Sequence, residues 1–159
     1  MASPRLARGR FSTPGAVYAI TTVTKGRLPV FHRQEPATCV AECIHGSDDA
    51  GWTQTHAWVV MPDHVHWLFS LAVGDLSACV RKFKSQSARS INRLVGTQGA
   101  IWQAGFFDHR MRDAEDLRAQ AMYVIRNPVR AGLVARSVDY PYWGCRWVSH
   151  ADADRIQGF

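Results

Sequence analysis

The sequence predicts an α+β domain with a small antiparallel sheet, ferredoxin-like or RRM-like, whose helices pack largely on one face. Two observations lead to this class. Two apolar runs are separated only by Pro62-Asp63, and segments with helical periodicity precede and follow them. The order strand, helix, strand pair, helix, helix fits a ferredoxin-like arrangement most simply. A length of 159 residues suits one domain over 1–159, with a basic N-terminal arm at 1–15 and an aromatic C-terminal tail at 138–159.

The strands are predicted from β-branched and aromatic runs. Residues 16–24 form the first such run, and Lys25-Gly26 closes it. Residues 56–61 and 64–71 form the second and third, and the short Pro62-Asp63 link makes them adjacent and antiparallel.

Three helices are predicted from apolar spacing. A short one covers residues 36–45, and the polar residues 46–49 end it as a turn. The main helix begins after Asp75 as N-cap. The last runs from about Asp113, with Asp116 three residues on, to Asn127, because Pro128 cannot continue it. The residues expected to face inward are Leu76, Val80, Phe83, Ile91 and Leu94 on the main helix, and Leu117, Ala121, Val124 and Ile125 on the last.

The overall charge favours a polyanionic partner. Lysine and arginine outnumber aspartate and glutamate by 19 to 13, which gives a net charge of +6 and a pI near 9.5. Four scattered cysteines do not suggest a disulfide scaffold or a zinc site. No apolar stretch approaches the length of a membrane span, so we expect a soluble, cytoplasmic protein that binds no membrane.

His64 and His66 form a His-x-His element on the third strand. Residues two apart on a strand project from the same face, so both imidazoles can bind one metal ion. The alternative is a pair of surface or satisfied core histidines, and the tripeptide alone does not decide between them.

Gln120, Tyr123 and Asn127 form a polar stripe on the last predicted helix. Their offsets of three and four residues bring a phenol and two amides to one side. The alternatives are a half-buried aromatic at 123 and an N-cap at 127 for a short turn ending at Gly132. A tyrosine nucleophile together with a histidine-bound metal would supply what phosphodiester cleavage without water requires.

The combination of motifs resembles the single-tyrosine transposases of the HUH endonuclease superfamily, and most closely the REP-associated tyrosine transposases. Met-Pro-Asp before His-x-His and Tyr-x-x-x-Asn-Pro-x-x-Ala-Gly-Leu after it carry the resemblance, which is highly specific. The other matching stretches are residues 18–24 and 101–109, so the resemblance runs from about residue 9 to residue 147.

The resemblance implies a function and a site. Tyr123 matches the catalytic tyrosine, His64 and His66 match the metal-binding pair, and Asn127 matches the helix residue that completes the metal site. The family implies cleavage of single-stranded DNA at hairpins of repetitive extragenic palindromes (REP), through a 5′-phosphotyrosine link that frees a 3′-hydroxyl. The expected cofactor is Mg²⁺ or Mn²⁺, Gln120 is a further candidate, and His109 has no assigned role.

DNA binding is expected from basic side chains, as a monomer or homodimer acting on the DNA of a bacterial nucleoid. The residues predicted to contact DNA are Arg10, Lys82, Lys84, Arg89 and Arg93. A solvated helix face is the alternative for those on the main helix. Two other functions remain open: a non-cleaving single-stranded nucleic-acid-binding protein on the same fold, and a hydrolytic metalloenzyme in which Tyr123 is structural.

Overall fold

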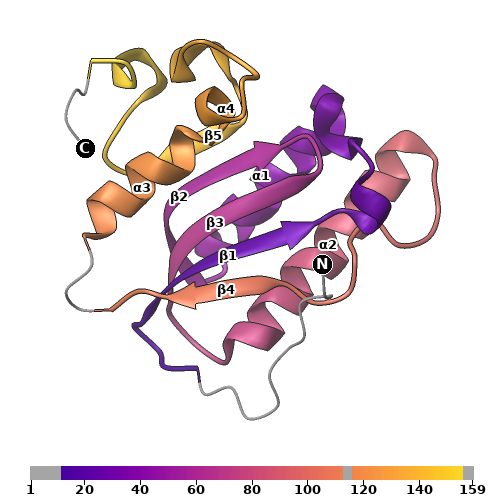
Figure 1. Ribbon diagram of the computed structural model, residues 1–159. Helices are drawn as coiled ribbons and strands as arrows, with labels where there is room; N and C mark the ends of the chain where they lie inside the picture. The colour runs from indigo at the N-terminus through magenta and orange to yellow at the C-terminus, as the bar shows by residue number, and fades with distance from the viewer. Residues whose placement is uncertain (1–11, 113–115, 156–159) are drawn as a thin grey trace.

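The fold is that of an α+β domain, as the sequence predicts. We describe residues 12–112 and 116–155 from a computed structural model (Figure 1). One sheet contains β1 (Val17–Val23), β2 (Thr53–Met61), β3 (His64–Leu71), β4 (Phe107–Arg110) and β5 (Trp143–Cys145). All neighbouring strands are antiparallel, in the order β4-β1-β3-β2-β5. The first four strands therefore have the ferredoxin-like order, and β5 extends the sheet beyond β2.

The helices lie on both faces of the sheet, with the two long ones together. The helices are α1 (Gln34–Asp49), α2 (Leu76–Val95), α3 (Leu117–Ile125) and α4 (Asn127–Arg130), with 3-10 turns η1 (Lys25–Arg27), η2 (Val30–His32), η3 (Ser137–Asp139) and η4 (His150–Asp152). In Figure 1, α1 and α2 lie behind the sheet. The shorter α3 packs on the other face, mainly against β2 and β5.

Alternation along β3 divides its side chains between the two faces. Val65, Trp67 and Phe69 are buried in the core under α1 and α2. Leu68 belongs to the second core under α3, and its neighbours two and four residues back, His66 and His64, project from that same face. The fold thus directs both histidines toward the side of the sheet where α3 packs.

Several predicted boundaries need correction. The first helix does not end at residues 46–49 but includes them, because the Asp48 carboxylate accepts hydrogen bonds from Thr53 and Thr55 of β2 and holds the last turn. Leu94 does not face inward and is 59% exposed, beside the C-terminus of α2. The last helix begins after Asp116, whose carboxylate accepts from the backbone of its first turn, and Asp113 lies outside the described residues.

Other predictions are confirmed. Asp75 caps α2 by accepting a hydrogen bond from the backbone of Ala78, and the other predicted inward residues of that helix are buried. The C-terminal segment packs on the domain, where Tyr140 donates a 2.5 Å hydrogen bond to the carbonyl of Val60 and Trp143 is buried. Within 12–112 and 116–155, no helix is both long and apolar enough to cross a membrane.

Candidate active site

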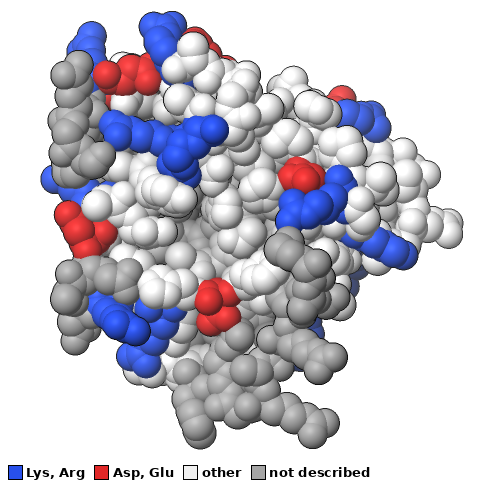
Figure 2. Space-filling model, in the orientation of Figure 1, with Lys and Arg blue, Asp and Glu red and all other residues white. Residues whose placement is uncertain are grey.

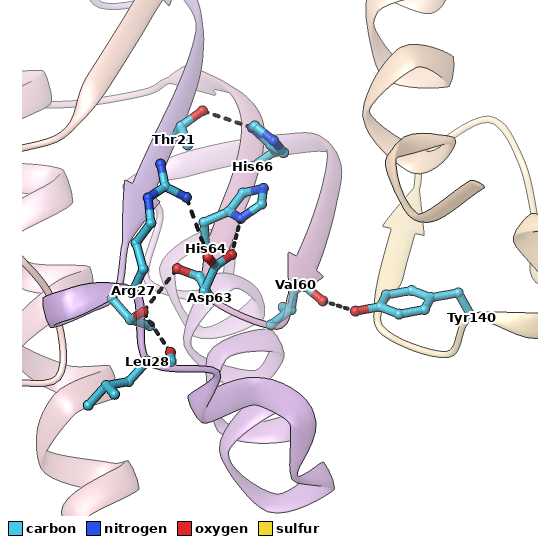
Figure 3. Close-up of polar contacts among 9 residues, drawn as sticks. Thr21, Arg27, Leu28, Val60, Asp63, His64, His66 and Tyr140 are labelled. Atoms are coloured by element: carbon cyan, nitrogen blue, oxygen red, sulfur yellow. Dashed lines mark hydrogen bonds and ion pairs between the residues drawn. The ribbon is translucent and has the colours of Figure 1, made fainter. Parts of the chain in front are cut away.

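The two histidines are held by different partners, and each uses Nδ1 for this purpose. Nδ1 of His66 lies 2.8 Å from the hydroxyl of Thr21 on β1, and Nδ1 of His64 lies 2.6 Å from the carboxylate of Asp63 (Figure 3). The ring centroids are 4.8 Å apart and the rings are nearly perpendicular. Contacts of this kind orient an imidazole and leave Nε2 as the nitrogen for a metal.

Asp63 links His64 to the loop after β1. Arg27 lies 3.4 Å from the second carboxylate oxygen of Asp63, as Figure 3 shows. Burial alone would raise the pKa of Asp63, but the hydrogen bonds and charges of His64 and Arg27 outweigh it and hold that pKa below its ordinary value. Asp63 is therefore a carboxylate at neutral pH. It fixes the orientation of the His64 ring.

The backbone of the same loop is tied to the turn that precedes His64. The amide of Thr24 donates to the carbonyl of Asp63 over 2.9 Å, and the amide of Phe31 donates to that of Pro62 over 3.0 Å. Arg27 has a positive φ of 52°, which is uncommon for a residue with a side chain. This loop holds the start of β3, and with it His64, in place.

His66 is neutral under ordinary conditions. Burial, assisted by the positive charges of His64 and Arg130, lowers the pKa of His66 to about 4. A neutral imidazole retains the lone pair with which histidine binds a metal. In the tautomer whose Nδ1–H donates to Thr21, that lone pair lies on Nε2.

The polar stripe of α3 forms the wall opposite His66. A cavity of about 260 Å³ lies between the sheet and this helix. The potentially reactive or ligating side chains that line it are His66, Asp108, His109, Gln120, Tyr123 and Asn127. Tyr123 is 58% exposed, so its phenol is accessible to a macromolecular substrate. The structure thus brings the predicted nucleophile and both amides to the same cavity as His66. The ring of His64 contacts that of His66.

His109 enters the site from β4, a strand that the sequence analysis did not predict. Residue 109 pairs with Ala19 of β1, two residues along from the pair that joins Phe107 to Thr21. His109 therefore projects from the same face as His66. A histidine in the matching 101–109 stretch was the available signal, and the missing strand left its direction undetermined.

The Asn-Pro-x-x-Ala-Gly-Leu motif forms a single helical turn with a closed end. Asn127 is the first residue of α4 and Arg126 occupies the N-cap position, which opposes the interpretation of Asn127 as the N-cap. At the other end, Gly132 has φ of 75°, its amide donates to Val129, and the amide of Leu133 donates to Pro128. This bonding pattern is the Schellman motif. Proline inside the start and glycine past the end fix the turn, and the turn fixes the side chain of Asn127.

Arg130, which the sequence analysis did not single out, lies directly against Tyr123. Its guanidinium carbon is 3.6 Å from the centroid of the Tyr123 ring. The charge of Arg130 also reaches His66, where it contributes to the lowered pKa. The spacing from Tyr123 through Asn127 to Arg130 is four and then three residues, so the helical stripe continues across the Asn-Pro junction.

The donor set fits a divalent metal ion. Two oriented imidazole nitrogens lie on one face, and amide oxygens from Asn127 and Gln120 line the facing cavity. Among the residues the structure describes, no three His, Cys, Asp or Glu side chains gather at a possible metal site. A metal held by the histidines would therefore take its remaining ligands from an amide, from water or from the substrate, as catalytic sites do.

The predicted DNA-binding residues do not gather at this site. Lys82, Arg89 and Arg93 are exposed on α2, which packs on the opposite face of the sheet from His66. Lys82 lies 4.2 Å from the ring centroid of Trp52, and the two arginines line a groove with Glu42 of α1. Their contact with DNA remains a prediction, and Arg10 lies outside the described residues.

Lys84 makes structural hydrogen bonds that were not predicted. Its ammonium donates to the carbonyl oxygens of Gln103 and Gly105 over 2.7 and 2.8 Å, and burial lowers its pKa. We therefore assign to Lys84 the role of holding the segment that leads into β4, and its contact with DNA stays a prediction.

The open face of the molecule is suited to a polyanion. Figure 2 shows a hollow near the centre of this face, with Lys and Arg side chains in blue around it and only scattered acidic groups in red. A hollow with a basic rim concentrates a negatively charged chain at its walls.

The geometry agrees with the comparisons with known proteins. The family model described as "Transposase IS200 like" matches residues 12–127, which include His64, His66, Tyr123 and Asn127. The chain belongs to the IS200-like transposase family. This membership rests on a match over most of the chain.

Relatives of this transposase fall in one group. It is 34% identical over 91 residues to the REP-associated tyrosine transposase of Escherichia coli, a match that covers 56% of this chain and 52% of that one. The chain thus spans about half the length of that relative in the alignment. It is 30% identical over 145 residues to a Haemophilus influenzae protein whose name assigns it provisionally to the same group, with 82% and 80% of the two chains covered.

One solved structure extends the likeness to the whole IS200-like domain. A REP-associated tyrosine transposase bound to a REP hairpin aligns with a TM-score of 0.71 and 26% identity, covering 98% of this chain and 87% of that one. The resemblance proposed from the sequence motifs is therefore confirmed at the level of family and fold.

Proposed function

We propose that this transposase cleaves and rejoins single-stranded DNA beside a hairpin, with Tyr123 as nucleophile and a divalent ion held by His64 and His66. The observation that carries the proposal is the cavity lined by His66 from β3, Tyr123 from α3 and Asn127 from the start of α4. A nucleophile and metal-binding side chains on separate elements thus face one space large enough for a phosphodiester group.

The proposed reaction is a transesterification. The Tyr123 oxygen attacks the phosphorus, a new bond forms between them, and the bond from phosphorus to the 3′ oxygen breaks. The phenol proton passes to water, and the departing 3′ oxygen takes up a proton, so a 5′-phosphotyrosine and a free 3′-hydroxyl result. The number of phosphoester bonds is unchanged, which allows a 3′-hydroxyl to reverse the step without ATP.

The side chains of the cavity prepare the reactants. Thr21 and Asp63 hold His66 and His64 with Nε2 available, and the closed turn after α3 holds Asn127 beside Tyr123. A bound Mg²⁺ or Mn²⁺ would supply charge neutralisation at the scissile phosphate. We propose Asn127 as the further ligand, with Gln120 as the next candidate.

The proposed substrate is a hairpin of the REP type. Two relatives of this chain carry that association in their names, and a structurally similar REP-associated tyrosine transposase was solved with a REP hairpin. A net charge of +6 and the basic rim of the open face are suited to such a substrate.

The test is trapping of a covalent adduct. The protein is incubated with Mn²⁺ and a hairpin-bearing single strand from the REP-like repeats of its own genome, and denaturing electrophoresis follows. We expect an adduct with the natural protein and none with Tyr123→Phe, which lacks only the attacking oxygen. Tyr142→Phe is the matched control, because its ring packs on Tyr140 and does not line the cavity. That variant should form the adduct normally.

The same experiment separates the two alternatives. Cut DNA without an adduct, from both the natural protein and Tyr123→Phe, would indicate the hydrolytic enzyme and overturn the role of Tyr123. Hairpin binding without cleavage across REP-like substrates and both metals would indicate the non-cleaving binding protein.

A further inference from the structure

Arg130 covers one face of the proposed nucleophile. The guanidinium carbon lies 3.6 Å from the ring centroid of Tyr123, which is the stacked geometry of a cation over an aromatic ring. Tyr123 is otherwise much exposed, since 58% of its surface is accessible. A phenol at that exposure would sample several rotamers without such a contact, so the guanidinium restricts the direction of the hydroxyl.

The backbone that carries Arg130 is fixed independently of the side chain. Arg130 is the last residue of α4, and the amides of Gly132 and Leu133 close this turn on Val129 and Pro128. Asn127 lies three residues earlier, at the start of the same turn. The turn therefore holds Arg130 three residues beyond Asn127, which lines the cavity beside Tyr123.

The charge of Arg130 lies where a phosphate would have to bind. For in-line attack, the scissile phosphorus must lie about 3–3.5 Å from the Tyr123 oxygen. Arg130 is in contact with the Tyr123 ring, and Tyr123 and His66 line the same cavity. A phosphate placed between the phenol oxygen and the histidines is thus close to the guanidinium, whose planar set of N–H donors matches phosphate oxygens.

We propose that Arg130 is a catalytic residue that holds the Tyr123 ring in the free protein and binds the scissile phosphate in the substrate complex. This inference rests on the proposed function of Tyr123. It assigns to Arg130 a share of the charge neutralisation that would otherwise come from the metal alone. A phosphate bound in this way presents one non-bridging oxygen to the guanidinium.

The test compares Arg130→Gln with Arg136→Gln in single-turnover cleavage of a saturating hairpin strand. Arg136 is the matched control, because it is exposed and its guanidinium pairs with Asp139, whereas that of Arg130 lies over the Tyr123 ring. We expect Arg130→Gln to lower the cleavage rate about 10²–10³-fold, the usual effect of losing one donor to a developing charge. Hairpin affinity should change little, Arg130→Lys should be intermediate, and Arg136→Gln should cleave normally.

A sulfur substitution distinguishes phosphate contact from a structural role. Each phosphorothioate diastereomer at the scissile position is cleaved by the natural protein and by Arg130→Gln. We expect one diastereomer to be slowed in the natural protein and the slowing to be smaller in the variant, because the contact to that oxygen is already lost. An identical sulfur effect in both proteins would overturn the phosphate contact.

A measurement without DNA tests the stacking. In the free protein, the Arg130 side-chain proton resonances should be shifted upfield by the Tyr123 ring, and Tyr123→Ser should remove the shift. If it is absent in the natural protein, the stacking is wrong. If Arg130→Gln cleaves at the full rate, the inference about Arg130 is wrong, but the role of Tyr123 still stands. If the natural protein forms no adduct at all, the proposed function itself is wrong.

Discussion

We predict that the fold requires glycine at position 132 because the backbone there has a positive φ, and not because a larger side chain would clash. It has φ of 75°, and a Cβ built on it meets no atom within 4 Å. Gly132→Ala therefore adds no clash but places an alanine in the left-handed region, which costs about 1–2 kcal/mol. Gly46 lies inside α1, and a Cβ built on it also meets no atom within 4 Å. Gly46→Ala is therefore the matched control, and its effect on stability should have the opposite sign. Gly46→Ala should stabilise by about 0.5–1 kcal/mol, because alanine favours a helix interior.

Thermal and denaturant unfolding of both variants measure this effect. For a domain of this size, 1 kcal/mol corresponds to a change in Tm of about 2–4 °C. Gly132→Ala should lower Tm, Gly46→Ala should raise it, and Gly132→Asn should fall between Gly132→Ala and the natural protein, because asparagine tolerates a positive φ. Gly132→Ala should also slow cleavage well below its Tm, since the turn holds Asn127 and Arg130. An unchanged or raised Tm for Gly132→Ala would refute the reasoning.

Three further predictions concern the site and the sheet. His66→Ala should abolish cleavage in Mg²⁺ and Mn²⁺ with a change in Tm of only about 2–4 °C, and a large loss of stability in metal-free buffer would instead indicate a core histidine. Asn127→Ser should abolish cleavage at unchanged stability, because serine is too short to reach a metal held by the histidines; retained cleavage would make Gln120 the next ligand to test. For His56, burial and then the charge of Arg146 lower the pKa below its unfolded value near 6.5, against a smaller opposing effect of Asp48. The neutral ring is thus favoured by folding, so its contribution is complete above about pH 6.5 and is lost as the pH falls below that value. The difference in unfolding free energy between the natural protein and His56→Gln should shrink over that range, and a constant difference would contradict the assignment.

The sequence predicted the parts of the fold that local patterns determine. The strand pair around Pro62-Asp63 and the capped start of α2 follow from alternation and an N-cap, which act over a few residues. The last turn of α1 was missed because Gly46 to Asp49 are turn-forming types, while Asp48 gains its partners from β2. β4 and β5 have four and three residues, too short for a periodic signal.

In the candidate site, too, the residues that follow from local spacing were predicted, whereas those that depend on tertiary contacts were not. His64, His66, Tyr123 and Asn127 were found from spacing and from a resemblance. In the structure, His66, Tyr123 and Asn127 line one cavity, and the ring of His64 contacts that of His66. Asp63 and Thr21 were not found as partners of the histidines, because their roles depend on which nitrogen faces the neighbouring group. Arg130 was visible only as a basic residue, although its spacing continues the stripe from Tyr123.

The central claim is that Tyr123 carries the DNA, and mapping the adduct tests it most directly. The adduct is digested with nuclease and trypsin and analysed by mass spectrometry. The chain has four tyrosines, and trypsin releases Tyr123 in a peptide of residues 119–126 that contains no other tyrosine. We predict that this peptide carries the residual nucleotide phosphate on Tyr123. The same mass on a peptide containing Tyr18, Tyr140 or Tyr142, with residues 119–126 unmodified, would contradict the assignment of the nucleophile.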